Sequence, residues 1–194
     1  MKNADVTREK LLEAAMQAFV VQSYSTVSLR AIARAAGVDV ALVSRYFGGK
    51  LGLFKAVLDV AFDWPEMREG ENPVAVAIAK YTNPDATDDH MAVIRLIIVN
   101  SADPEVGEMM RDSLRRMLMD PMLARMGGAQ AAPQLALFVA ATLGMAMVRH
   151  SLKLPGVADA SPQEYAAQLR HMIDAALGYG DSKVGSSTSG AAQT

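Results

Sequence analysis

The 194-residue sequence contains no cysteine. That absence excludes disulfide frameworks, thiolate metal sites and cysteine nucleophiles, and it permits a reducing compartment. No apolar run approaches the roughly 20 residues that a membrane span requires, and the first residues are polar and charged rather than basic and then apolar. We therefore expect a soluble, cytoplasmic protein with no membrane contact.

Neither sign of charge is in large excess, because 19 basic residues stand against 21 acidic ones. For nucleic-acid binding the clustering of charge matters more than its sum. Residues 1–64 hold 8 Lys and Arg against 6 Asp and Glu (+2), whereas residues 65–194 hold 11 against 15 (−4). The N-terminal part is therefore the better suited to face phosphate, although so mild an asymmetry supports nucleic-acid binding only weakly.

Apolar residues recur at helical spacing along most of the chain, and no segment alternates as a half-buried strand does. Asp103-Pro104 and Ser161-Pro162-Gln163-Glu164 each place a capping side chain before a first-turn proline, and the second is also a capping box. The pattern predicts an all-α fold of about nine helices. They are expected at residues 7–22, 29–36, 40–47, 50–63, 73–81, 88–100, 104–119, 133–153 and 162–177.

Residues 28–47 carry two short helical patterns separated by Gly37-Val38-Asp39, which is the layout of a helix-turn-helix. Ala33 supplies the small residue at the helix contact, Gly37 tolerates positive φ in the turn, and Val43 is the apolar anchor of the second helix. Three residues should complete the core: Ile32, Val38 and Phe47. Six should point outward: Arg30, Arg34, Leu42, Ser44, Arg45 and Tyr46. Such a face suits the major groove, but a tight helical hairpin with a solvated face has the same spacing.

Further short motifs surround this segment in a fixed order. They are Leu11-Leu12-Glu13-Ala14-Ala15-Met16-Gln17-Ala18-Phe19, then Ile32-Ala33 and Ala36-Gly37-Val38, then Tyr46-Phe47-Gly48-Gly49-Lys50, and finally Leu53-Phe54. In this order and spacing, residues 7–58 resemble the DNA-binding region of the tetracycline-repressor (TetR) family. The resemblance implies an N-terminal three-helix helix-turn-helix domain, a C-terminal helical domain, and a homodimer that binds a palindromic double-stranded DNA operator.

The resemblance also implies which residues touch DNA. They are Ser28, Arg30, Val40, Ala41, Leu42, Ser44, Arg45, Tyr46 and Lys50, of which Tyr46 and Lys50 match positions that usually hold phosphate. Leu42 and Ser44 stand where the family more often has threonine and tyrosine, so the operator sequence cannot be carried over. Leu42 fits a thymine methyl group. Ser23 replaces the glycine that usually ends the first helix.

A stretch rich in Pro, Gly and Glu, from Trp64-Pro65 to Pro73, is the expected seam between two units. We expect residues 1–64 to form the DNA-binding domain, including a linking fourth helix, and residues 65–179 to form a helical ligand-sensing and dimerising domain. Residues 180–194 have almost nothing apolar to bury and are expected to be a disordered tail.

The helices near residues 133–153 and 162–177 are the expected dimer interface. Small residues recur at every fourth position, a ridge that lets another helix approach closely. They are Ala132, Ala136, Ala140 and Gly144, with Phe138, Thr142 and Met145 opposite. Packing within one chain would explain this pattern nearly as well, and only the resemblance favours dimerisation.

A small, apolar effector is the expected ligand, because methionine is dense in the C-terminal part and flexible thioethers line adaptable pockets. Methionines also fill ordinary cores. The candidate ligand-binding residues are Trp64, Met91, Arg95, Met117, Phe138 and Met145. Arg95 is alone in an apolar helix, where it could meet an anionic ligand, although an internal ion pair fits it better.

Two alternatives remain at this stage. A helical enzyme has little support, because the three histidines form no i, i+4 pair with one another and no Glu-x-x-His pair or phosphate-binding glycine loop occurs. We expect no enzyme activity, metal or cofactor. The other alternative is a DNA-binding protein of the same fold that a protein partner controls; an enclosed apolar cavity favours an effector, and an exposed apolar patch favours the partner. Repression is taken as the family default.

Overall fold

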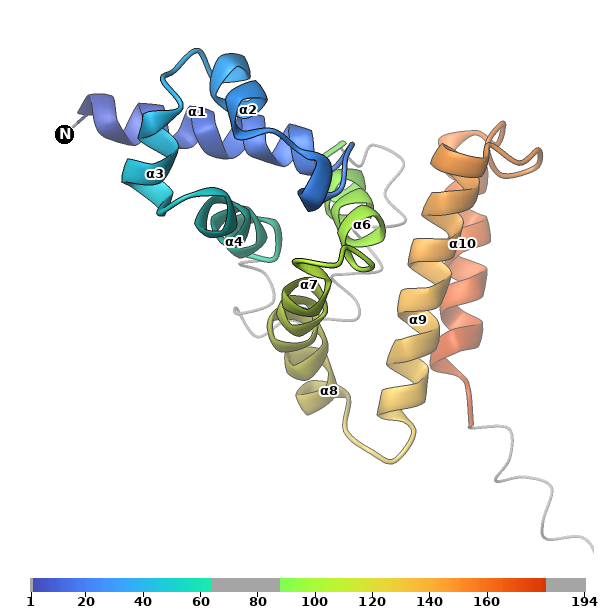
Figure 1. The fold of residues 1–194 in the computed structure, drawn as a ribbon. Coiled ribbons are helices and arrows are strands. Elements are labelled where there is room, and N and C mark those ends of the chain that lie inside the picture. The colour runs from blue at the N-terminus through green and yellow to red at the C-terminus, as the bar shows by residue number, and fades with distance from the viewer. Residues whose placement is uncertain (1, 64–87, 181–194) are drawn as a thin grey trace, which may run out of the picture. The chain divides into compact units, whose positions relative to one another are not determined.

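The computed structural model describes residues 2–63 and 88–180 (Figure 1). Every regular element in these ranges is a helix, as the apolar spacing predicts. The described residues form two compact units, one made of residues 2–63 and 88–118 and the other of residues 119–180. The expected helix at 73–81, the seam at 64–73 and the tail beyond residue 180 lie outside the described residues.

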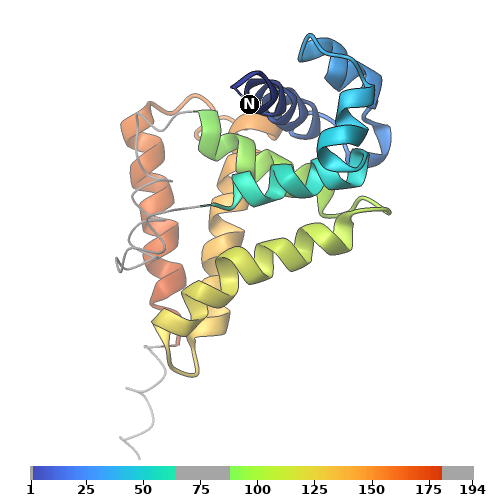
Figure 2. The same ribbon diagram turned by 90° about the vertical axis from the view of Figure 1, so that its left-hand side faces the viewer.

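The first unit places a long N-terminal helix beside three short ones. Its elements are α1 (Lys2–Phe19), the 3-10 helix η1 (Tyr24–Thr26), α2 (Leu29–Ala35), α3 (Ala41–Phe47), α4 (Lys50–Ala61), α6 (Asp88–Asn100) and α7 (Gly107–Leu114). The π-helix η3 (Arg115–Met119) follows α7. Helix α1 packs against α2, α4 and α6, so it is the common support of the unit (Figures 1 and 2).

Three aromatic rings form the centre of this unit. The Phe19 and Phe54 rings meet edge to face, with their centroids 4.9 Å apart and an interplanar angle of 86°. Tyr24 stacks on Phe19 at 5.9 Å and meets the edge of Phe54 at 5.2 Å. All three side chains are buried. Because aromatic pairs in these geometries add to the gain from buried area, the cluster fixes α1, η1 and α4 against one another.

Two buried polar side chains join the end of α6 to the turn after α1. Asn100 is fully buried; its Oδ1 accepts from the Tyr24 backbone N–H at 2.8 Å, and its Nδ2 donates to the Phe19 and Leu96 carbonyls at 2.9 and 3.0 Å. Asp103 accepts from the backbone N–H of Ser25 at 2.8 Å and from its hydroxyl at 3.0 Å. We call these two side chains, with the hydrogen bonds that they make, the α6–α7 corner.

Asp103 also corrects one predicted helix boundary. Its Oδ1 accepts from the backbone N–H of Glu105 at 2.9 Å and of Val106 at 3.3 Å, as a capping side chain does. However, α7 begins only at Gly107 and not at Pro104. Asp103 also accepts hydrogen bonds from Ser25, and residues 101–106 form turns instead of a helix. The capping residue was predicted; the start of the helix was wrong by three residues.

The second unit contains α8 (Asp120–Met126), α9 (Ala131–Ala146), the π-helix η4 (Met147–Leu152) and α10 (Pro162–Leu177). Helices α9 and α10 lie side by side and run in opposite directions (Figures 1 and 2). The predicted capping box is present, since the Ser161 hydroxyl accepts from the Glu164 N–H and the Glu164 carboxylate accepts from the Ser161 N–H. It fixes the start of α10 where the sequence placed it.

One feature of the second unit departs from the sequence analysis. Residues Ala131–Leu152 form 22 helical residues with a mean hydropathy of 1.7, long and apolar enough for a bilayer by length and composition alone. By length and composition, the expectation that no segment is long and apolar enough for a membrane span is therefore wrong. The core helix of a soluble protein can meet the same criteria, and the face of α9 that carries Phe138, Thr142 and Met145 is buried.

Gly52 allows α4 to start directly against the end of α3. A Cβ atom at this position would lie 1.7 Å from the Phe47 carbonyl oxygen, which belongs to the backbone and cannot rotate away. We expect Gly52→Ala to lower the free energy of unfolding by at least the roughly 1–3 kcal/mol typical of overpacking. Urea unfolding followed by circular dichroism measures this loss.

Gly144 provides the matched control for that substitution. It is also a helical glycine, but a Cβ there meets nothing within 4 Å. At a protein concentration low enough to keep the chain monomeric, Gly144→Ala should therefore leave stability unchanged or raise it by about 0.5–1 kcal/mol, since alanine is the better helix former. Equal effects of the two substitutions would contradict the close approach at Gly52.

The pKa of Asp103 makes its contribution depend on pH. Burial by itself raises this pKa, but the hydrogen bonds from Ser25, Glu105 and Val106 outweigh burial and lower it. A lowered pKa in the folded state means that the carboxylate stabilises the fold above its unfolded pKa, and that this stabilisation is lost as the pH falls through the folded value.

Asp103→Ala should therefore cost about 1–3 kcal/mol at neutral pH, because buried donors lose their acceptor. The difference from the wild type should stay constant from about pH 7 to about pH 5 and shrink as the pH falls below about 4, the pKa of an aspartate in the unfolded chain. Denaturant unfolding at several pH values tests this, with Asp112→Ala on the exposed side of α7 as the control. A difference that stays constant over the pH range would show that the Asp103 carboxylate is not the group responsible.

Candidate nucleic-acid interface

The predicted helix-turn-helix is present, with α2 and α3 joined by a tight turn. Gly37 has φ +68°, the left-handed conformation that favours glycine. The Val38 N–H donates to the Ala33 carbonyl at 2.9 Å and closes the end of α2. The Asp39 carboxylate then accepts from the Ala41 N–H at 2.7 Å, at the start of α3. The turn residues that the sequence singled out therefore set the angle between the two helices.

The two faces of this motif separate as predicted at some residues, but two predicted core residues and two predicted outward ones are equally half-buried. Ile32, Ala33 and Val43 are buried, and Val38 and Phe47 are half-buried. Six of the nine residues that the resemblance assigns to DNA are exposed: Ser28, Arg30, Val40, Ala41, Ser44 and Arg45. The other three are half-buried: Leu42, Tyr46 and Lys50. The structure therefore leaves Ser44 and Arg45 of α3, with Val40 and Ala41 at its start, exposed to solvent.

Cations gather along this segment and two of them lie near aromatic rings. Residues 28–50 hold four basic residues and one acidic residue, a balance of +3 in a chain whose total is −2. The Lys50 ammonium lies 4.4 Å from the centroid of the Tyr24 ring, and the Arg45 guanidinium lies 6.0 Å from that of Tyr46. Positive charge is thus concentrated on residues 28–50, whose balance of +3 exceeds the +2 of residues 1–64 as a whole.

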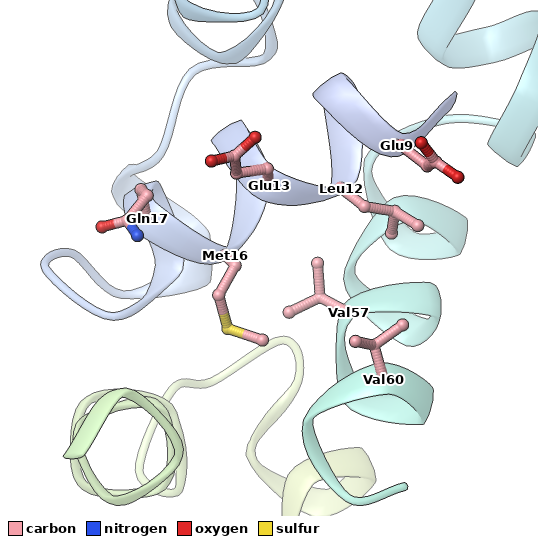
Figure 3. Close-up of a pocket in the computed structure, with 7 residues that line it drawn as sticks. All are labelled: Glu9, Leu12, Glu13, Met16, Gln17, Val57 and Val60. Atoms are coloured by element: carbon pink, nitrogen blue, oxygen red, sulfur yellow. The ribbon is translucent and has the colours of Figure 1, made fainter. Parts of the chain in front are cut away.

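A groove between α1 and α4 offers a different kind of surface within the same unit. Its volume is about 410 Å³, and Leu12, Met16, Val57 and Val60 point into it (Figure 3). Glu9, Glu13 and Gln17 stand on its α1 side. Leu12 and Met16 are both half-buried. This groove has the apolar lining and few polar groups that small-molecule sites share.

The predicted ligand-binding residues are distributed over both units. Trp64 and the side chain of Met91 lie outside the described residues. Met117 is half-buried in the first unit, and Phe138 and Met145 are buried in the second. Arg95 is exposed on α6, so the expected internal ion pair is wrong: the arginine takes the solvent side of the helix while Ile94 and Leu96 beside it are buried.

The surface of α9 and α10 carries exposed apolar side chains. The small residues Ala132, Ala136, Ala140 and Gly144, which form the predicted ridge, are exposed. Leu137 is 40% exposed and Met172 is 42% exposed. A shallow groove of about 410 Å³ runs between the helices, lined by Leu137, Ala140, Ala141, Met172, Ala175 and Ala176. We call this surface the α9–α10 face.

Two residues that hold the segment before the helix-turn-helix in place, Asn100 and Asp103, were not predicted to have this role. Asn100 received no role, and Asp103 was identified only as a helix cap. A signal was present, because Asn100 ends an otherwise apolar helix, where a buried amide needs hydrogen-bond partners. Those partners lie 76 or more residues away at Phe19 and Tyr24, beyond the reach of any local pattern.

Comparison with protein families identifies both parts of the chain. The family described as "Bacterial regulatory proteins, tetR family" matches residues 11–57. The family described as "Tetracyclin repressor-like, C-terminal domain" matches residues 69–177, more than half of the chain. The first match contains the helix-turn-helix and the second contains α6 to α10.

Individual proteins agree with these matches. The chain is 44% identical over 55 residues to the HTH-type transcriptional regulator SrpR of Pseudomonas putida. It is 48% identical over 60 residues to the HTH-type transcriptional regulatory protein RaaS of Mycobacterium tuberculosis. These alignments cover 28% and 30% of this chain and only 26% and 28% of the two relatives.

Solved structures share the fold over most of the length. A TetR transcriptional regulator from Rhodococcus sp. RHA1 has a TM-score of 0.53 at 19% identity, covering 92% of this chain and 99% of its own. A tetR-family regulator from Streptomyces coelicolor has a TM-score of 0.56 at 21% identity, covering 91% of this chain and 84% of its own. At these identities the likeness concerns the fold alone.

Proposed function

Because this chain belongs to the tetracycline-repressor family of transcriptional regulators, we propose that it represses transcription as a homodimer on a palindromic operator and leaves it when a small, apolar effector binds. The family combines a DNA-binding helix-turn-helix with a ligand-binding C-terminal domain, so the chain is a transcription factor and not an enzyme. The observation that carries the proposal is the exposed side of α3, which lies in a segment, residues 28–50, with a charge balance of +3.

Helix α3 would read base edges in the major groove. Arg45 suits the two acceptors of guanine, and Ser44 can bond to a base or a phosphate. Leu42, half-buried, presents an apolar surface to a thymine methyl group. Ser28 and Arg30 would contact DNA from the start of α2, and Val40 and Ala41 would contribute shape. Tyr46 and Lys50 would bind phosphate, which sets register and affinity without reading sequence.

The α9–α10 face supports dimerisation. Exposed apolar side chains and a ridge of small residues suit close contact with the same two helices of a second copy. This use also accounts for the high hydropathy of Ala131–Leu152 without a bilayer. Two recognition helices held about 34 Å apart, one turn of DNA, would then read a palindrome. The proposal requires a cytoplasmic protein, because the operator lies there.

The effector would act on the part of the chain after residue 64, and residues 1–64 would read DNA. Phe138 and Met145, both buried in the second unit, are the candidate pocket residues that the structure describes best. Met117, half-buried in the first unit, is a separate candidate. An effector needs only a difference in affinity between the DNA-bound and free conformations, and about 1–3 kcal/mol of coupling is typical.

A protein partner remains the second candidate for control. The observation that favours it is the same exposed α9–α10 face, which a different chain could cover instead of a second copy. The oligomeric state separates the two possibilities. A stable homodimer occupies the face and favours an effector, whereas a monomer leaves it open for a partner.

Selection of bound duplexes from random DNA by the purified protein tests the proposed function directly. We expect enrichment of a palindrome whose affinity falls as salt increases, because phosphate contacts release counterions. The absence of enrichment by a folded protein would contradict operator binding. Enrichment of a single half-site would keep DNA binding and contradict the dimer.

Arg45→Ala should reduce binding to the selected operator while leaving nonspecific binding nearly unchanged. A bidentate contact to a base contributes about 1–3 kcal/mol of discrimination, or roughly 5- to 150-fold in affinity. Arg116→Ala removes the same charge from an exposed site in η3, outside the helix-turn-helix, and is the matched control. Circular dichroism should show both variants folded. Unchanged operator affinity of Arg45→Ala would remove Arg45 from the base-reading surface.

Charged substitutions on the α9–α10 face should dissociate the dimer. Leu137→Glu combined with Met172→Glu would place carboxylates in the apolar contact, where they lose water without gaining a partner. Analytical ultracentrifugation should show a dimer for the wild type and a monomer for this variant. Val21→Glu, at an exposed apolar residue of the first unit, should remain dimeric. A dimer that survives the double substitution would place the interface elsewhere.

A further inference from the structure

Lys50 rests on an aromatic ring whose position is fixed. Its ammonium lies 4.4 Å from the Tyr24 centroid, within the range of a cation–π contact. Tyr24 is only 5% exposed and its ring is held between Phe19 and Phe54. A lysine side chain normally loses much conformational freedom when it is placed against a partner. Here the ring restricts that freedom before any DNA arrives.

The position of Tyr24 depends in turn on the α6–α7 corner. Asn100 accepts from the Tyr24 backbone N–H, and Asp103 accepts from the next residue along the chain. Asn100 also donates to the Phe19 carbonyl at the end of α1. Burial raises the pKa of the Tyr24 phenol, with further increases from Glu105 and Asp103, so the phenol stays neutral beside these carboxylates. Residues of η1 and of the corner thus share one hydrogen-bonded structure.

We propose that Tyr24 is a positioning residue for Lys50, and that Asn100 and Asp103 position Tyr24, so that the α6–α7 corner sets the strength of a DNA phosphate contact. This rests on the proposed role of Lys50 in the function described above. The corner fixes η1 through hydrogen bonds to its backbone. The Tyr24 ring in turn fixes the position of the Lys50 ammonium through the cation–π contact.

Through this arrangement, a movement of α6 would change DNA affinity without changing the position of α3. If α6 shifts relative to η1, the hydrogen bonds of Asn100 break or Tyr24 moves with it. In either case Lys50 loses a prearranged position. The resulting loss of affinity concerns phosphate binding, so it should be equal for operator and nonspecific DNA.

A double-mutant cycle on a nonspecific duplex separates positioning from general damage to the fold. Tyr24→Leu and Asn100→Ala are each combined with Lys50→Ala, and dissociation constants are measured at about 50 and 200 mM salt. Lys50→Ala alone should weaken binding and reduce the slope of log K against log salt by about one per protomer. Tyr24→Leu should weaken binding about two- to five-fold per protomer when Lys50 is present, the range of an exposed cation–π contact.

In the Lys50→Ala background, Tyr24→Leu and Asn100→Ala should have no further effect. Tyr24→Phe keeps the aromatic face and should bind DNA as the wild type does. If Asn100→Ala is too unstable to assay, the comparison of Tyr24→Leu with Tyr24→Phe still tests the positioning role. Equal losses from Tyr24→Leu with and without Lys50 would overturn the positioning role and leave DNA binding by Lys50 intact. Wild-type protein that shows no salt-dependent binding to any duplex would overturn the proposed function together with this inference.

Discussion

The amide of Asn100, buried at the end of α6, is the constraint on which the first unit depends. A buried amide without partners costs on the order of 1–3 kcal/mol, so its oxygen and nitrogen must be satisfied wherever α6 lies. They are satisfied by the backbone of Phe19, Tyr24 and Leu96. Consequently α6 and α7 belong to the same compact unit as the helix-turn-helix, and the unit does not end where the DNA-binding motif ends.

The same constraint relates the aromatic cluster to the surface. Phe19 and Tyr24 are held by Asn100 through their backbones, and their rings pack with Phe54. Phe54 belongs to α4, and Gly52 near the start of α4 packs closely against the Phe47 carbonyl at the end of α3. The orientation of the recognition helix therefore follows from packing that extends from α6 to α3, and each step is a direct contact.

Much of the fold was predictable because its determinants are local. Gly37 adopts the positive φ that the turn requires, and Ser161 with Glu164 forms the capping box. Both features need residues only a few positions apart, which a single sequence displays. The exposed side of α3 was also predictable, since helical spacing separates its buried Val43 from the exposed Ser44 and Arg45.

What could not be predicted depends on distant partners. Arg95 was expected to be paired inside the protein, and the role of Asn100 was missed, because in both cases the outcome depends on which face of α6 meets α1. The start of α7 was misplaced for a related reason: Asp103 caps it while bonding to Ser25, 78 residues earlier. Local capping rules contain no information about such a partner.

The exposed α9–α10 face has a quantitative consequence for regulation. If a chain must pair through this face before it can hold a palindrome, the amount of active protein at low expression rises with the square of the chain concentration. A cell that halves its supply of this protein would then lose about three quarters of the operator-competent species. The apolar ridge on one helix pair would thereby convert modest changes in protein abundance into a steep transcriptional response.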